Sequence, residues 1–159
     1  SQVFFGFANL QIASRLIMGQ FPDYRQVIPA DETFISRICV SRAALIESLE
    51  LASVISREIS KGRGSIIRLT LEEDKINLYS SSQDEGTFDE NVSALVEGEK
   101  LELNYNARYL LDVLRVMDDE RIELRLTGAN TPGIIQADVE DKTDKDRFLY
   151  LILPVRINK

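Results

Sequence analysis

The feature that most restricts the fold of this chain is a pattern of strands and helices that occurs twice. The first copy spans roughly residues 33–97 and the second roughly residues 99–157. In each copy, a strand with alternating apolar residues leads into an amphipathic helix, and three more strands follow. The copies agree in register and helix position although few residues are identical. Because self-similarity at a long period indicates repeated supersecondary units, we predict an α+β fold with a duplicated β-α-β-β-β unit and two helices packed on antiparallel sheets.

The limits of the predicted elements follow from apolar periodicity and from residues that cap helices. The first copy has a strand at 33–40, a helix from Ser41 to about residue 60, and strands at 67–71, 76–79 and 86–96; the second has a strand at 100–105, a helix that Asn106 can cap, and strands at 121–127, 134–139 and 148–153. The apolar stripe of the first helix comprises Leu45, Leu49, Ala52 and Ile59, and that of the second comprises Ala107, Leu110, Leu111, Leu114 and Met117. Both helices are therefore expected to bury one face.

A short segment between two prolines precedes the duplicated unit. Pro22 and Pro29 restrict the backbone at both ends of residues 21–29, and Asp23 is suited to the start of a single helical turn between them. Its large apolar side chains predict that this segment docks against another surface; they are Phe21, Tyr24, Val27 and Ile28. Residues 3–18 are strand-like. We therefore interpret residues 1–29 as the last strands of one domain plus a connector, and residues 30–159 as a complete second domain.

Composition excludes several kinds of active site. The 159 residues include no histidine and one cysteine, which rules out histidine-containing triads, imidazole zinc sites and disulfides within the chain. Cys39 lies in a strand pattern, so we expect a small buried side chain and not a nucleophile. We predict a cytoplasmic protein without a cofactor. The first residues do not resemble a signal peptide, and no segment is long enough to span a membrane. Because the chain has no initial Met and its first residues look like a strand entered midway, we interpret it as an excised or truncated C-terminal piece.

The net charge also limits the kind of partner. The formal net charge of −7 argues against a protein that simply coats nucleic acid. That argument does not apply to a ring with an acidic outer surface and a basic inner surface, so the placement of the charges also matters.

Four segments in order resemble one family. They are residues 21–29 (FPDYRQVIP), 51–58 (LASVISRE), 106–114 (NARYLLDVL) and 150–157 (YLILPVRI). Together with the duplicated unit, they make essentially the whole chain similar to bacterial DNA polymerase III beta subunits, the sliding clamps. The resemblance implies the end of a middle domain followed by the third domain of a three-domain subunit. Two such subunits form a homodimeric ring around duplex DNA, without catalytic chemistry, and tether the polymerase III alpha subunit, the clamp loader and other factors.

The resemblance also assigns roles to individual residues. A pocket for a short apolar peptide motif would be formed by Pro22, Val27, Gly133, Leu151, Ile152, Leu153, Pro154, Val155 and Arg156. Gln26 stands where the family has a basic residue, and Leu149 is better explained as part of a buried strand. The side chains expected to face DNA are Arg57, Lys61, Arg63, Arg108 and Arg115. Val54 and Ile55 would pack against the first domain of another subunit, so this chain alone is expected to be a monomer or a weak dimer.

Two other readings remain open from the sequence. Helices cradled by antiparallel strands, in duplicate, also resemble double hotdog enzymes that act on acyl thioesters. Such enzymes need a carboxylate or histidine at a cleft and usually a glycine-rich helix start. The chain has no histidine, and residues 41–44 and 106–109 contain no glycine. The third reading is a protein-interaction module without a role on DNA.

Overall fold

The computed structural model describes residues 1–55, 65–82, 86–139 and 148–157. The strands are β1 (Gln2–Phe7), β2 (Leu10–Arg15), β3 (Ser36–Ser41), β4 (Ile66–Leu71), β5 (Lys75–Ser82), β6 (Gly86–Gly98), β7 (Glu102–Asn106), β8 (Arg121–Leu126), β9 (Gly133–Ala137) and β10 (Leu149–Ile152). The helices are α1 (Arg42–Ile55) and α2 (Ala107–Val116), and two 3-10 turns, η1 (Tyr24–Gln26) and η2 (Asp31–Thr33), precede β3.

The duplicated unit is confirmed, since β3-α1-β4-β5-β6 is followed by β7-α2-β8-β9-β10. Within the described residues, eight strands form one antiparallel sheet in the order β10-β9-β8-β3-β6-β5-β4-β7. The first strand of each copy pairs with the strand that follows the helix of the other copy: β3 with β8, and β7 with β4. The two copies are therefore interlocked in a single sheet, and neither forms a separate domain.

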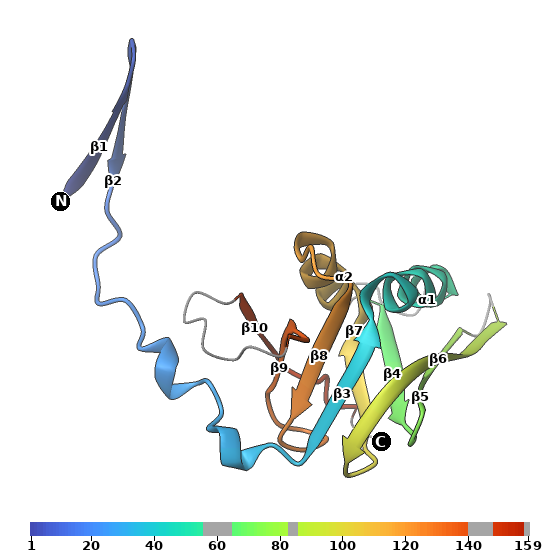
Figure 1. Ribbon diagram of the computed structural model, residues 1–159. Helices are drawn as coiled ribbons and strands as arrows, with labels where there is room; N and C mark the ends of the chain where they lie inside the picture. Colours follow the sequence, from blue (N-terminus) through green and yellow to red (C-terminus); the bar gives the residue numbers. More distant parts are fainter. Residues whose placement is uncertain (56–64, 83–85, 140–147, 158–159) are drawn as a thin grey trace.

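Both helices lie side by side against one face of the curved sheet (Figure 1). The predicted stripes of the two helices face the core; their buried members are Leu45, Leu49, Ala52, Ala107, Leu110, Leu111, Leu114 and Met117. The strands contribute alternate residues to the same core, among them Leu69, Leu78 and Leu103, as expected when one face of a sheet is covered. Full burial of one such leucine stabilises the fold by about 2 kcal/mol relative to exposure. Ile59, the last residue of the predicted first stripe, lies outside the described residues.

The predicted caps are present at both helix starts. At α2, the Oδ1 atom of Asn106 accepts a hydrogen bond from the backbone N–H of Arg108 at 3.0 Å. At α1, the hydroxyl of Ser41 accepts a longer bond, 3.5 Å, from the backbone N–H of Ala44. These bonds satisfy backbone donors that have no partner within the helix, so they fix where each helix begins. Over the part of the chain that the structure describes, neither helix has the length and apolar character needed to cross a lipid bilayer.

The N-terminal residues form a hairpin rather than the continuous strand region that the sequence suggested. β1 and β2 pair in antiparallel fashion, and Ala8 makes the turn between them with a positive φ of 48°. The hairpin stands apart from the eight-stranded sheet, at the far end of an extended connector (Figure 1). Its large apolar side chains, including Phe4, Phe7 and Ile12, are exposed. A two-stranded ribbon buries little surface by itself, and the assignment of residues 1–29 to a different domain stays a prediction.

Candidate functional site

The connector contains the single helical turn that its prolines and Asp23 predict. In η1, Asp23 accepts hydrogen bonds from the backbone N–H of Arg25 and from the side-chain amide of Gln26, both at 3.2 Å. Gln26 thus helps to hold the turn closed. Among the described residues, the apolar side chains of the connector do not dock on another part of the chain, since Phe21 and Val27 are largely exposed. The turn therefore presents an apolar surface on an ordered backbone.

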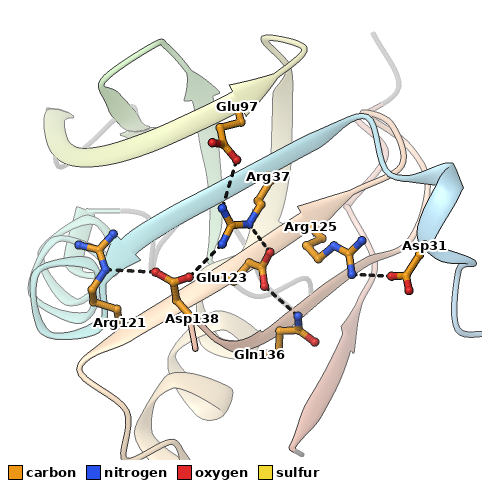
Figure 2. A network of polar contacts seen from close by, with 8 residues as sticks. All are labelled: Asp31, Arg37, Glu97, Arg121, Glu123, Arg125, Gln136 and Asp138. Atoms are coloured by element: carbon orange, nitrogen blue, oxygen red, sulfur yellow. Dashed lines mark hydrogen bonds and ion pairs between the residues drawn. The ribbon is translucent and has the colours of Figure 1, made fainter. Parts of the chain in front are cut away.

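The end of the connector is attached to the sheet by Arg125. Its Nη1 atom pairs with Oδ1 of Asp31 at 2.7 Å, and its guanidinium lies 4.1 Å from the centre of the Phe34 ring (Figure 2 shows the ion pair). Asp31 belongs to η2, and Phe34 directly follows that turn. An arginine that holds both a carboxylate and a ring restrains the residues between them. This contact fixes the direction in which the connector enters β3.

The C-terminal segment, residues 153–157, leaves β10 and crosses to β7. The backbone N–H of Val155 donates a hydrogen bond to the carbonyl oxygen of Asn104 at 2.6 Å. Leu153 is 63% exposed, Pro154 and Val155 are half-buried, and Arg156 is exposed. This segment therefore offers the mixture of apolar surface and one cation that the sequence predicts for a peptide contact.

Two of the predicted pocket residues lie in the interior instead. Ile152 is 2% exposed and faces the core, and Gly133 is opposite it in the β9–β10 ladder. A Cβ atom on Gly133 would lie 2.7 Å from the side chain of Leu126, so a larger residue there would displace that leucine. Leu149, expected to be buried, is 36% exposed and Leu151 is half-buried, because the pleat of β10 turns Ile152 inward. The prediction for Leu149 is wrong, and Gly133 and Ile152 can influence a pocket only through packing.

The structure brings only part of the predicted pocket together. Gly133 and β10 are neighbours, and the C-terminal segment continues from β10. Pro22 and Val27 lie on the extended connector, and both are exposed. The cavity beside the C-terminal segment includes Ile157 but no connector residue, and the cavity beside Asp31 includes no residue of the C-terminal segment. These residues therefore form two separate apolar surfaces in this chain.

The predicted basic surface is described only on α2. Arg108 is highly exposed and its nearest carboxylate, that of Asp112, is 3.8 Å away. Arg115 is also exposed, but its Nη2 atom pairs with Oε1 of Glu50 on α1 at 2.6 Å, which links the two helices. The other residues expected to face DNA, Arg57, Lys61 and Arg63, lie outside the described residues. Val54 is exposed on α1 and Ile55 is half-buried, so Val54 in particular is available for a partner.

An ionic network centred on Arg37 occupies the outer face of the sheet, which is the face opposite the core residues Ile38 and Val40 (Figure 2). Arg37 on β3 pairs with Glu123 at 2.5 Å, with Asp138 at 3.0 Å and with Glu97 at 3.1 Å. Glu123 is only 2% exposed and also accepts a hydrogen bond from the side chain of Gln136 at 2.8 Å. The hydrogen bonds to Glu123 and then Glu97 raise the pKa of Arg37 above its ordinary value. Sequence reasoning missed this network, because its members come from four strands and the residues that follow them.

This network has a structural role. Burial raises the pKa of the neighbouring Cys39 thiol to about 11, which disfavours the nucleophilic thiolate. Cys39 is 2% exposed, so the prediction of a small buried side chain is confirmed. Among the described residues, the acidic side chains and the cysteine form no group of three that could hold a metal ion. The network therefore holds strands together, and we assign it no catalytic role.

Comparisons with known proteins find one family repeatedly. The family model described as DNA polymerase III beta subunit, C-terminal domain matches residues 25–156. The chain is 30% identical over 157 residues to the beta sliding clamp of Staphylococcus aureus strain Mu50, and this alignment covers 98% of this chain and 39% of that protein. In structure it is similar to a DNA polymerase III beta subunit from Thermotoga maritima, with a TM-score of 0.83, 30% identity, and coverage of 99% of this chain and 40% of that one.

A second solved structure adds information about a bound molecule. A sliding clamp from Bartonella birtlesii bound to griselimycin matches with a TM-score of 0.82 and 28% identity, over 98% of this chain and 39% of that one. The chain therefore spans about two-fifths of the length of the proteins that it resembles.

Proposed function

Because this chain belongs to the family of the DNA polymerase III beta subunit, C-terminal domain, we propose that it forms part of a DNA sliding clamp. The observation that carries the proposal is the match of nearly the whole fold to clamps, at a TM-score of 0.83 over 99% of the chain. Residues 30–159 would be the third clamp domain, and residues 1–29 would complete a middle domain. These relatives also favour a clamp over an acyl-thioester enzyme.

The work of such a protein is topological. A closed homodimeric ring holds its partners on duplex DNA by encirclement, so it needs no catalytic residues and no recognition of base sequence. The exposed arginines of α2 would contribute phosphate contacts at the inner surface. Arg108 is the better placed of the two, because Arg115 is already paired with Glu50. Val54, exposed on α1, would contribute to the contact between subunits.

Partner proteins would bind through short apolar peptide motifs. On this chain, Val27 on the connector and Leu153 on the C-terminal segment would provide separate apolar contacts for such a motif, and Pro154 and Arg156 lie beside Leu153. The polymerase III alpha subunit and the clamp loader are the partners that we propose. The griselimycin complex of the Bartonella clamp supports a ligand pocket in this fold.

The peptide surface can be tested on the 159-residue chain by nuclear magnetic resonance. A Gln-Leu-Ser-Leu-Phe peptide is titrated into the ¹⁵N-labelled chain, and chemical-shift changes are followed residue by residue. The proposal predicts saturable shifts at Val27, Leu151 and Leu153, which weaken when Pro154 and Arg156 are both replaced by alanine. Replacement of two exposed arginines outside the predicted pocket residues, Arg108→Ala with Arg121→Ala, serves as the control. Shifts that are absent at millimolar peptide, or equal in all three proteins, would refute the assignment of the peptide surface.

A further inference from the structure

A cavity on the outer face of the sheet contains an arginine that the proposed function does not use. The cavity has a volume of about 290 Å³ and lies where β4, β5 and β7 meet the C-terminal segment. Arg68 and Asn104 line it together with Tyr79, and the wall is completed by Ile66, Ser80, Ser81 and Ile157. Arg68 is opposite Tyr79 in the β4–β5 ladder and opposite Asn104 in the β4–β7 ladder. The three side chains therefore form one row across the strands, with the guanidinium in the middle.

The guanidinium of Arg68 lies over the ring of Tyr79, with its central carbon 4.3 Å from the ring centre. Stacking of this kind holds an arginine in place through its face, while the N–H groups at its edge can still donate to a carboxylate. Among the residues that the structure describes, no carboxylate pairs with Arg68. A carboxylate partner is present at five of the other nine described arginines: Arg37, Arg108, Arg115, Arg121 and Arg125. Arg68 shares with Arg15, Arg25, Arg42 and Arg156 the lack of such a partner among the described residues, but of these five it is the one stacked on a ring in the cavity.

The internal repeat allows Arg68 to be compared with the residue at the equivalent position in the other copy. Cys39 on β3 is opposite Glu123 on β8, and Asn104 on β7 is opposite Arg68 on β4. In each case the first residue is two positions before the end of the strand that leads into the helix, so Glu123 and Arg68 occupy equivalent positions in the two copies. Glu123 is neutralised by Arg37 (Figure 2). Arg68 carries the opposite charge at the equivalent position, and among the described residues it has a ring but no carboxylate beside it.

We propose that this cavity, here called the Arg68 cavity, binds a carboxylate of a partner peptide. The inference rests on the proposed function, because the peptide would already lie along the C-terminal segment. The hydrogen bond from Val155 to Asn104 places that segment directly against the cavity, and Ile157 is part of both. An acidic residue that flanks the apolar anchors of the peptide therefore enters the cavity.

The chemistry of recognition follows from the lining. The edge of the Arg68 guanidinium can donate two parallel hydrogen bonds to a carboxylate, and the side chains of Asn104 and Ser81 are further donors in the same cavity. Ile66 and Ile157 line the same cavity and supply apolar contacts beside the guanidinium. A neutral amide of the same shape would lose the ionic part of this interaction.

The cavity can be tested directly, without any peptide. Phenylacetate is titrated into the labelled 159-residue chain, and phenylacetamide serves as the neutral ligand. We expect saturable shifts of the Arg68 side-chain N–H and of the Asn104 side-chain amide with phenylacetate only. Arg68→Gln should abolish the Asn104 shift, whereas Arg108→Gln, which changes an exposed arginine on α2, should leave it unchanged. Equal shifts with both ligands, or an unchanged Asn104 shift in Arg68→Gln, would overturn the proposal.

A second experiment separates the Arg68 cavity from the peptide surface. The Gln-Leu-Ser-Leu-Phe peptide is extended with Gly-Asp-Asp or with Gly-Asn-Asn, and both are titrated by fluorescence anisotropy. We expect the acidic peptide to bind about fivefold more tightly, and Arg68→Gln to remove that difference while the affinity of the neutral peptide stays the same. Failure of the neutral peptide to bind would count against the peptide surface alone. Equal binding of both peptides to the unchanged chain would refute acidic recognition by Arg68.

Discussion

Replacement of Arg37 by methionine should be among the most destabilising changes on the outer face of the sheet. Glu123, its partner at 2.5 Å, is 2% exposed, so loss of the guanidinium leaves a buried carboxylate with only the amide of Gln136 beside it. Removal of one member of a buried ion pair costs about 3–5 kcal/mol. The Arg37 side chain is 33% exposed, so water partly replaces it and we expect the lower limit, about 3 kcal/mol. Glu97 is more exposed and contributes little.

Urea unfolding followed by far-ultraviolet circular dichroism measures this loss. With a urea dependence of about 2 kcal/mol per molar, a loss of about 3 kcal/mol lowers the midpoint by about 1.5 M. Arg108→Met is the matched control, because its carboxylate partner is 3.8 Å away on an exposed face, and it should change the free energy by less than about 0.5 kcal/mol. Addition of Glu123→Gln to Arg37→Met should recover more than about 1 kcal/mol, since the buried charge is removed. Equal midpoints for Arg37→Met and Arg108→Met would refute the reasoning.

Three further predictions concern stability and reactivity. Gly98→Ala should lower the free energy of unfolding by about 3 kcal/mol, because Gly98 has a φ of +93° and a new Cβ would lie 2.1 Å from the carbonyl oxygen of Ile35. Gly86→Ala is the control: its φ is +101°, but a new Cβ would meet nothing within 4 Å, so it should cost only about 1 kcal/mol. Thermal unfolding measures both changes. Asn106→Ala removes the cap of α2 and should cost about 1 kcal/mol by urea unfolding; a change below a few tenths would contradict the role of the cap. Cys39, whose pKa is about 11, should resist Ellman's reagent at pH 8 until the chain unfolds. Since its folded pKa exceeds the ordinary value of 9.0, its contribution to stability is present below pH 9 and is lost as pH rises towards 11, which unfolding at pH 7 and pH 10.5 can measure.

The periodic parts of this fold could be predicted from sequence, because periodicity depends on local geometry. The stripe of α2 and its Asn106 cap follow from spacing alone, and the structure has both. The hairpin could not be resolved, since its turn at Ala8 lacks the usual glycine or asparagine at the position with positive φ and alternation continues through it. Leu149 was misassigned because the inward face of a four-residue strand depends on its register with β9.

The ionic features of the structure depend on pairing between distant strands. Arg37 meets Glu123 across β3 and β8, and Arg68 meets Tyr79 across β4 and β5; both contacts follow from strand register. Nothing in the sequence around Arg37 or Arg68 reveals that one is surrounded by carboxylates while the other is not. The resemblance to clamps, in turn, located the connector and the C-terminal segment, but it did not show that Ile152 faces the core.

The measurement that tests the account most directly asks whether this chain can serve as the matching part of a clamp. In a chimera, it replaces the corresponding 39% of the Staphylococcus aureus clamp. The chimera is checked for dimeric size, loaded on nicked circular DNA, and followed by gel filtration before and after the DNA is cut. The account predicts that it stays on circular DNA and is released when the DNA becomes linear. A dimeric chimera that dissociates equally fast from both forms would contradict the proposal that this chain belongs to a sliding clamp.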